Sequence, residues 1–167
     1  MKTVLRTAAA SVAIASLAVS APAWAATETA TAEAEILAAL DVTLDSTLNT
    51  LDFGSIAESG AGGTVTLAPA AVTPVCSAGL VCSGTVETPN FDIDGEAGAT
   101  VNISHAPTMS LASGANTMSV ALSASAASLV LDGSGVGTFD MGGVLTVGAN
   151  QAVGTYTGQL EVNVVYN

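Results

Sequence analysis

Apolar and polar side chains alternate along most of this chain, which is the pattern of half-buried β-strands. The longest alternating run extends from Ala32 to Leu44, with Ala34 and Ile36 on its apolar face and acidic residues on the other. This run predicts a strand. Residues 33–40 also contain strong helix formers, so a helix is the alternative in that stretch.

Shorter alternating runs predict further strands, and turn-forming residues separate them. The predicted strands cover residues 64–67, 84–86, 90–93, 100–103, 117–122, 137–141, 144–147 and 155–165. Clusters of Gly, Asn, Asp and Ser predict turns at residues 58–63, 94–98, 113–116, 132–135 and 148–151. Short strands at this spacing are typical of an antiparallel β-sandwich, and the length of 167 residues fits one domain.

The first 25 residues have the pattern of a secretory signal peptide. Lys2 and Arg6 supply the positive start, a short apolar stretch follows, and residues 23–25 form an A-x-A cleavage site. The apolar stretch is interrupted by serines and closed by a proline, so it is too short and too polar for a membrane span. We therefore expect an exported mature chain that begins at Ala26 and has no membrane span.

The charge balance is extreme, with 14 acidic residues, two cations and a formal net charge of −12. Both cations precede residue 7, so the predicted mature chain has no Lys or Arg. A polyanion repels phosphate backbones, which excludes nucleic-acid binding. Surface ion pairs cannot stabilise such a chain, which must depend on packing and on the backbone hydrogen bonds of its sheets.

The two cysteines, Cys76 and Cys82, are predicted to form a disulfide bond. An even number of cysteines in an exported chain favours a bridge, and Gly79 between them suits a tight turn. A zinc site needs four ligands, whereas His105 is the one histidine.

Catalytic chemistry is not evident in this sequence. His105 follows a predicted strand and is interpreted as a turn residue, because no nucleophile and acid accompany it as a triad. Residues 92–96 resemble the opening of a calcium-binding loop but lack its terminal glutamate, so a turn is the better interpretation. We expect no enzyme activity, no cofactor and no metal site.

The carboxyl-terminal strand carries a recognisable pattern. Gly154 lies fourteen residues from the end, Tyr166 is penultimate, and Tyr156 lies on the same face as Tyr166. This terminal strand resembles that of the chaperone–usher pilin superfamily.

Three further motifs resemble a more specific group. The sequence LDFG at residues 51–54, together with LTVG at 145–148 and GTYTG at 154–158, is similar to a bacterial surface family known as domain of unknown function 4402. The spore-coat-U type of secreted fimbrial-like protein has a related pattern.

The pilin resemblance implies an immunoglobulin-like sandwich that lacks its last strand and receives a strand from the next subunit. The N-terminal extension at residues 26–37 would then donate Ala32, Ala34 and Ile36 to a neighbour, and residues 38–167 would form the sandwich. The partners implied are other copies of the chain, a periplasmic chaperone and an outer-membrane usher, with a surface fimbrium as the product. The alternative is a secreted monomer that acts as a binding or envelope-matrix protein.

Overall fold

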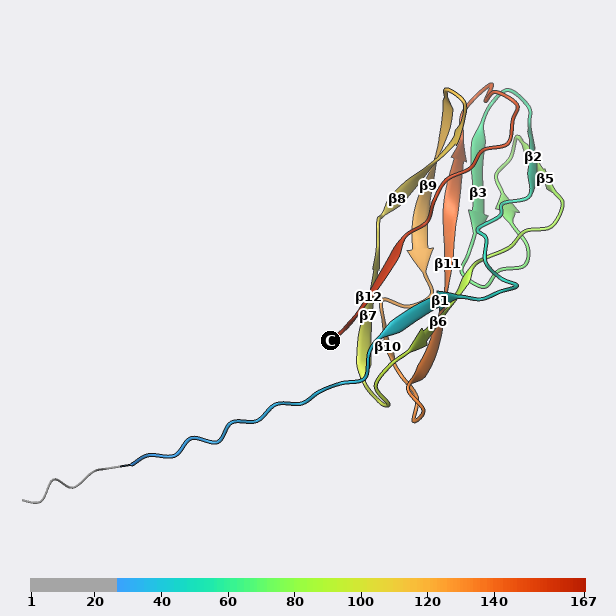
Figure 1. Ribbon diagram of the computed structural model, residues 1–167. Coiled ribbons are helices and arrows are strands. Elements are labelled where there is room, and N and C mark those ends of the chain that lie inside the picture. Colours follow the sequence, from blue (N-terminus) through green and yellow to red (C-terminus); the bar gives the residue numbers. More distant parts are fainter. Residues whose placement is uncertain (1–26) are drawn as a thin grey trace, which may run out of the picture. The chain divides into compact units, whose positions relative to one another are not determined.

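Antiparallel β-strands joined by turns make up the domain, and the described residues, 27–167, contain no helix (Figure 1). These residues belong to a computed structural model, and the predicted signal peptide at residues 1–25 lies outside them. Residues 36–167 form one compact unit that holds every described strand. The predicted fold class, an all-β antiparallel sandwich, is confirmed, whereas its immunoglobulin-like details stay a prediction.

The described chain forms twelve strands. They are β1 (Asp41–Leu44), β2 (Ser55–Glu58), β3 (Gly63–Leu67), β4 (Val75–Cys76), β5 (Leu80–Ser83), β6 (Asn90–Asp94), β7 (Thr100–His105), β8 (Thr108–Ser113), β9 (Asn116–Ala124), β10 (Ser128–Val130), β11 (Val136–Val147) and β12 (Val162–Tyr166).

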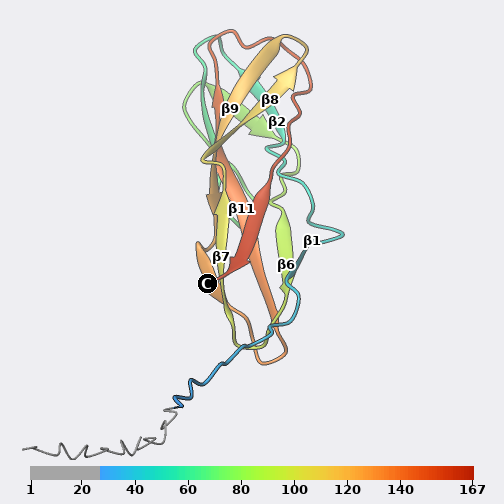
Figure 2. The ribbon, with the colours of Figure 1, turned by 60° about the vertical axis from the view of Figure 1, so that its left-hand side comes forward.

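The long strand β11 organises the largest sheet. Its first half pairs with β6, and its second half lies between β3 and β9. The edges of this sheet are β1 beside β6, β4 beside β3, and β8 beside β9. A second sheet has the order β10–β7–β12, and β2 pairs with β5. Figure 2 shows β12 passing over β11, and apolar side chains of these two strands share one core cluster.

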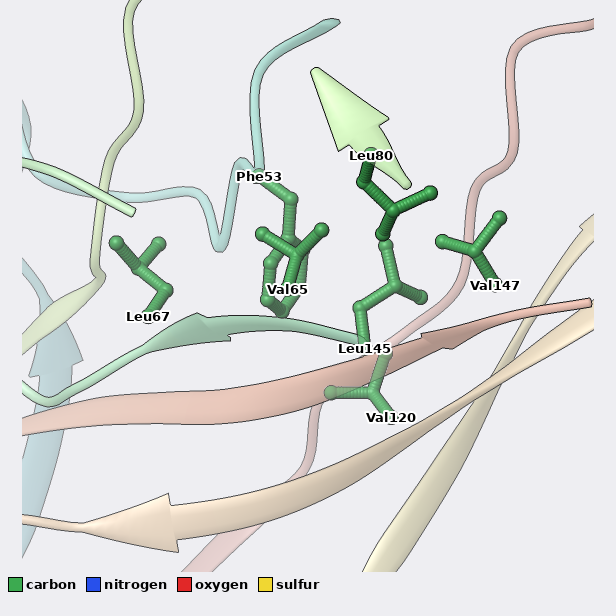
Figure 3. Packing of buried hydrophobic residues seen from close by; sticks show 7 residues of the cluster. All are labelled: Phe53, Val65, Leu67, Leu80, Val120, Leu145 and Val147. Atoms are coloured by element: carbon green, nitrogen blue, oxygen red, sulfur yellow. The ribbon is translucent and has the colours of Figure 1, made fainter. Parts of the chain in front are cut away.

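Two apolar clusters fill the interior. The first joins β3, β9 and the end of β11, and Figure 3 shows its side chains converging. Its buried members are Phe53, Val65, Leu67, Leu80, Val120, Leu145 and Val147. The second lies between β6, β7 and the start of β11. Its buried members are Phe91, Ile93, Val101, Ile103, Leu131, Phe139 and Met141.

The structure differs from the sequence predictions in the N-terminal run. Residues 32–40 are neither strand nor helix, and only Asp41–Leu44 of the predicted strand is formed. The strand begins only at Asp41 because its partner strand, β6, ends at Asp94, and Asp94 is the residue that pairs with Asp41. The residues before Asp41 have no further strand beside them.

The predicted strand at residues 84–86 is also wrong. Strand β5 ends at Ser83, and Gly84 has a φ of +84°, which breaks the extended backbone. The predicted terminal strand at residues 155–165 forms only in its last part, as β12 (Val162–Tyr166), so Gly154 and Tyr156 precede the strand. The two predicted strands at 137–141 and 144–147 are one continuous strand, β11.

Candidate functional site

A long groove opens over the first core cluster. It has a volume of about 1660 Å³ and lies between residues 49–58 on one side and residues 151–162 on the other. Both buried and half-buried apolar side chains line its floor, so the core is incompletely covered here. These floor residues are Phe91, Met109, Leu111, Met118, Leu145, Val147 and Leu160.

The first wall contains the LDFG motif. Phe53 is 5% exposed and enters the core beside Val65 and Leu80 (Figure 3). Gly54 has a φ of +72°, and a Cβ there would lie 2.7 Å from the carbonyl oxygen of Ser83, so glycine is required for this close approach. The motif thus fixes the backbone of this wall to the domain.

Two carboxylates hold the approach to the first wall. Asp45 accepts hydrogen bonds from the hydroxyl and the N–H of Thr47 and from the N–H of Leu48, at 2.6–2.8 Å. The Thr47 hydroxyl and these two backbone N–H groups lower the pKa of Asp45. Glu87 accepts the N–H groups of Asn49 and Thr50 at 2.9 and 2.8 Å. The start of the wall therefore has defined backbone positions.

The second wall contains the GTYTG motif. A Cβ on Gly158 would lie 2.5 Å from the carbonyl oxygen of Ser110, and one on Gly154 would lie 2.6 Å from Oγ of Ser113. Both glycines therefore let this segment lie directly against β8. Tyr156 closes the loop before it, since its hydroxyl donates to the carbonyl of Ala152 at 2.8 Å.

The backbone of the second wall has unused hydrogen-bonding groups. Among the described residues, Gly158, Gln159 and Leu160 take part in no backbone hydrogen bond. On the opposite wall, β2 pairs with β5 along one edge. A row of free N–H and C=O groups beside an apolar floor is the surface that accepts an added strand.

The groove carries acidic side chains at its rim, namely Asp52, Glu58 and Glu161. No Lys or Arg occurs in residues 27–167 to balance them. Within this part of the chain, no three His, Cys, Asp or Glu side chains gather as a metal-binding group. The arrangement is suited to binding an extended, largely apolar peptide.

No helix in the part of the chain that the structure describes is long and apolar enough to cross a membrane.

The predicted disulfide between Cys76 and Cys82 is confirmed. It joins β4 to β5, with the two Cα atoms 6.4 Å apart. Neither cysteine lines the groove.

The sequence-predicted assembly residues have different positions. Gly154 and Tyr156 line the groove, whereas Tyr166 lies at the far end of β12 and packs in the second cluster. Ala32, Ala34 and Ile36 are exposed, and Ile36 retains 94% of its accessible surface.

Strand β8, which supplies Met109 and Leu111 to the floor, is not among the predicted strands. The alternation of these apolar residues with threonine, serine and alanine over 108–113 was the available signal.

The fold and groove define an antiparallel β-sandwich domain with an incompletely covered core. Residues 40–166 match the family described as Domain of unknown function (DUF4402), and the chain belongs to this family. No curated protein and no solved structure matches the chain.

Proposed function

We propose that this protein is an exported structural subunit that assembles into surface fibres by strand donation. Each copy would place its extended N-terminal segment in the groove of the next copy. The added strand would pair with the free backbone groups of the second wall and cover the apolar floor.

The observation that carries this proposal is the position of the two family motifs. LDFG and GTYTG are about a hundred residues apart in the sequence, yet they form opposite walls of the same groove. In each motif a glycine lets the wall lie close to the rest of the domain, and a larger residue at that position would push the wall away. If the two motifs served only to pack the core, no open groove between them would be needed.

The N-terminal segment has the dimensions of a donor strand. Residues 27–37 would extend over about 36 Å at roughly 3.3 Å per residue, which is longer than an ordinary strand of about 17–20 Å. Ile36 is the largest of the three predicted donor side chains, Ala32, Ala34 and Ile36, and is almost fully exposed. Its burial in a groove would contribute about 1.5–3 kcal/mol.

Export is part of the same proposal. The predicted signal peptide would direct the chain to the periplasm, and a disulfide bond is compatible with an oxidising compartment. A periplasmic chaperone would cover the apolar groove before assembly, an outer-membrane usher would pass subunits outward, and the product would be a fimbrium at the cell surface.

A second candidate function is that of a secreted monomer whose groove binds an extended peptide of another protein. The small side chains of the N-terminal segment favour it, since alanine at positions 32 and 34 covers little of the apolar floor. This candidate predicts an empty groove in the purified protein and no growth of oligomers.

The test compares three proteins isolated after export: wild type, Ile36→Asp and Val72→Asp. Val72 is 83% exposed and does not line the groove, so its substitution is the matched control for adding a charge. We expect ladders of oligomers by light scattering for wild type and the control. A charge on the inserted face costs several kcal/mol, so Ile36→Asp should be monomeric. A monomeric wild type, or an Ile36→Asp protein that assembles normally, would refute strand donation.

A further inference from the structure

One residue at the root of the N-terminal segment is held at both of its backbone groups. The N–H of Ala38 donates to Oε2 of Glu96 at 2.9 Å. The hydroxyl of Tyr166 donates to the carbonyl of Ala38 at 3.0 Å and accepts the N–H of Glu96 at 2.7 Å. Ala38, Glu96 and Tyr166 therefore form a closed set of three contacts, which we call the Ala38 clamp.

The clamp packs against the turn at Gly95. A Cβ on Gly95 would lie 2.5 Å from the hydroxyl of Tyr166 and 3.0 Å from Cδ1 of Leu40. Glycine at this position is what lets the tyrosine hydroxyl and the start of β1 approach the same turn. The N–H of Gly95 donates to the carbonyl of Gly135 at 2.9 Å, which ties the turn to the chain just before β11. The clamp is thus built on a fixed turn.

The clamp lies well outside the groove. Tyr166 lies four positions after Val162, which is the nearest groove-lining residue on β12. Gly95, just after β6, likewise lies four positions after the groove-lining Phe91. Four residues of strand span about 13 Å.

The clamp therefore limits where Ile36 can go. Ile36 is two residues before Ala38, so its backbone reaches at most about 7 Å from the clamp. It cannot enter the groove of its own chain while the clamp is closed. If the clamp opened, a two-residue turn at residues 38 and 39 would bring Ile36 opposite Asp41, beside the groove-lining Val42.

We propose that Tyr166 and Glu96 are positioning residues that reserve Ile36 for the groove of a second copy. This inference rests on the proposed strand donation and adds the reason why a subunit does not fill its own groove. The clamp decides between closure within one chain and assembly between chains.

The test uses full-length exported protein with the double substitution Tyr166→Phe and Glu96→Ala. Tyr166→Phe keeps the ring in the second cluster and removes the hydroxyl, and Glu96→Ala removes the acceptor for Ala38. Two controls are matched. Glu96→Gln keeps an acceptor oxygen, and Ser125→Ala removes a hydrogen bond to the N–H of Asp140 that has no contact with Ala38 or with the groove.

We measure oligomer size by light scattering and hydrogen exchange of the amides at residues 30–37 in the monomer fraction. Loss of these hydrogen bonds should raise the ratio of closed monomer to oligomer about tenfold, and the monomer's amides should become protected. The Glu96→Gln and Ser125→Ala proteins should keep the wild-type ratio. Each single variant, Tyr166→Phe or Glu96→Ala, should show a smaller shift, which provides a measurement if the double variant is unstable.

The outcomes separate the two proposals. Wild-type assembly with an unchanged ratio and unprotected amides in the variants would overturn the clamp and leave strand donation standing. A wild type that does not assemble would overturn strand donation, and the clamp inference with it.

Discussion

Thr157 and Ala112 exchange two backbone hydrogen bonds, of 3.0 and 2.8 Å, although they are 45 residues apart in the sequence. This pair fixes the terminal segment to β8, and a few residues later β12 pairs with β7. The terminal segment is therefore anchored along one edge only. Its residues also line the groove, so a strand bound in the groove would lie beside it.

Gly158→Ala should destabilise the domain by about 1–3 kcal/mol. The added Cβ would lie 2.5 Å from the carbonyl oxygen of Ser110 and 2.9 Å from Cε of Met109, and a backbone oxygen has little freedom to move away. Urea denaturation of the purified protein measures the change.

The control for this substitution is Gly133→Ala, because a Cβ on Gly133 has no heavy atom within 4 Å. We expect its free energy of unfolding to stay within about 0.5 kcal/mol of wild type. Equal effects of the two substitutions would contradict the close packing of the terminal segment on β8.

Removing the disulfide by Cys76→Ser with Cys82→Ser should cost about 2 kcal/mol, because the bridge closes a short loop and constrains the unfolded chain only modestly. Neither cysteine lines the groove, so assembly measured by light scattering should persist at temperatures well below unfolding. Loss of assembly in a protein that unfolds like wild type would show that the bridge acts on the groove.

The fold class could be predicted from the sequence because apolar and polar residues alternate in every strand that has one buried face. Strand β6 is an example, since Phe91 and Ile93 are buried and Asp92 and Asp94 point outward. The disulfide was predictable for a different reason, namely that two cysteines allow one pairing.

The errors arise where pairing depends on distant residues. Alternation in residues 32–40 could not reveal that β6 ends opposite Asp41. Gly142 and Gly143 separated two predicted strands, but both are buried inside the single strand β11, where a Cβ on Gly143 would lie 2.7 Å from Cγ1 of Val120.

The groove itself had no sequence signal of its own. Its two walls are far apart in the sequence, so it depends on the long-range order of all the strands. The two motifs could be recognised in the sequence, but their shared position could not.

The Asp132 carboxylate should stabilise the folded domain at neutral pH and lose this effect at low pH. The backbone N–H of Val136 and the hydroxyl and N–H of Ser134 donate to its carboxylate and lower its pKa below the ordinary value of 3.8. The folded state therefore binds the proton less readily than the unfolded state. This stabilisation is present above pH 3.8 and is lost as the pH falls through the lowered pKa.

The measurement is the melting temperature of wild type and Asp132→Ala between pH 7 and pH 2. Asp132→Ala should melt a few degrees below wild type at pH 7, and the gap should narrow at the acidic end. Asp94→Ala removes the same charge without a hydrogen-bonded turn, so it separates the effect of net charge from that of the turn. A gap that is constant with pH would contradict the role of the Asp132 carboxylate.

The apolar floor should bind a neutral, environment-sensitive dye such as Nile red as long as no strand covers it. A neutral dye is required because the carboxylates of Asp52, Glu58 and Glu161 would repel an anionic one. We expect strong fluorescence from the Ile36→Asp protein, which strand donation predicts to be unassembled, and weak fluorescence from wild-type oligomers.

Adding Leu111→Asn to the Ile36→Asp protein should lower dye binding several-fold, because Leu111 is a half-buried floor residue and an amide there disfavours apolar contact. The matched substitution is Val75→Asn, at a side chain that is 70% exposed and outside the groove. It should leave dye binding unchanged. If the two substitutions lower the fluorescence equally, or if wild-type oligomers bind the dye as strongly as Ile36→Asp monomers, then the groove is not the surface that assembly covers.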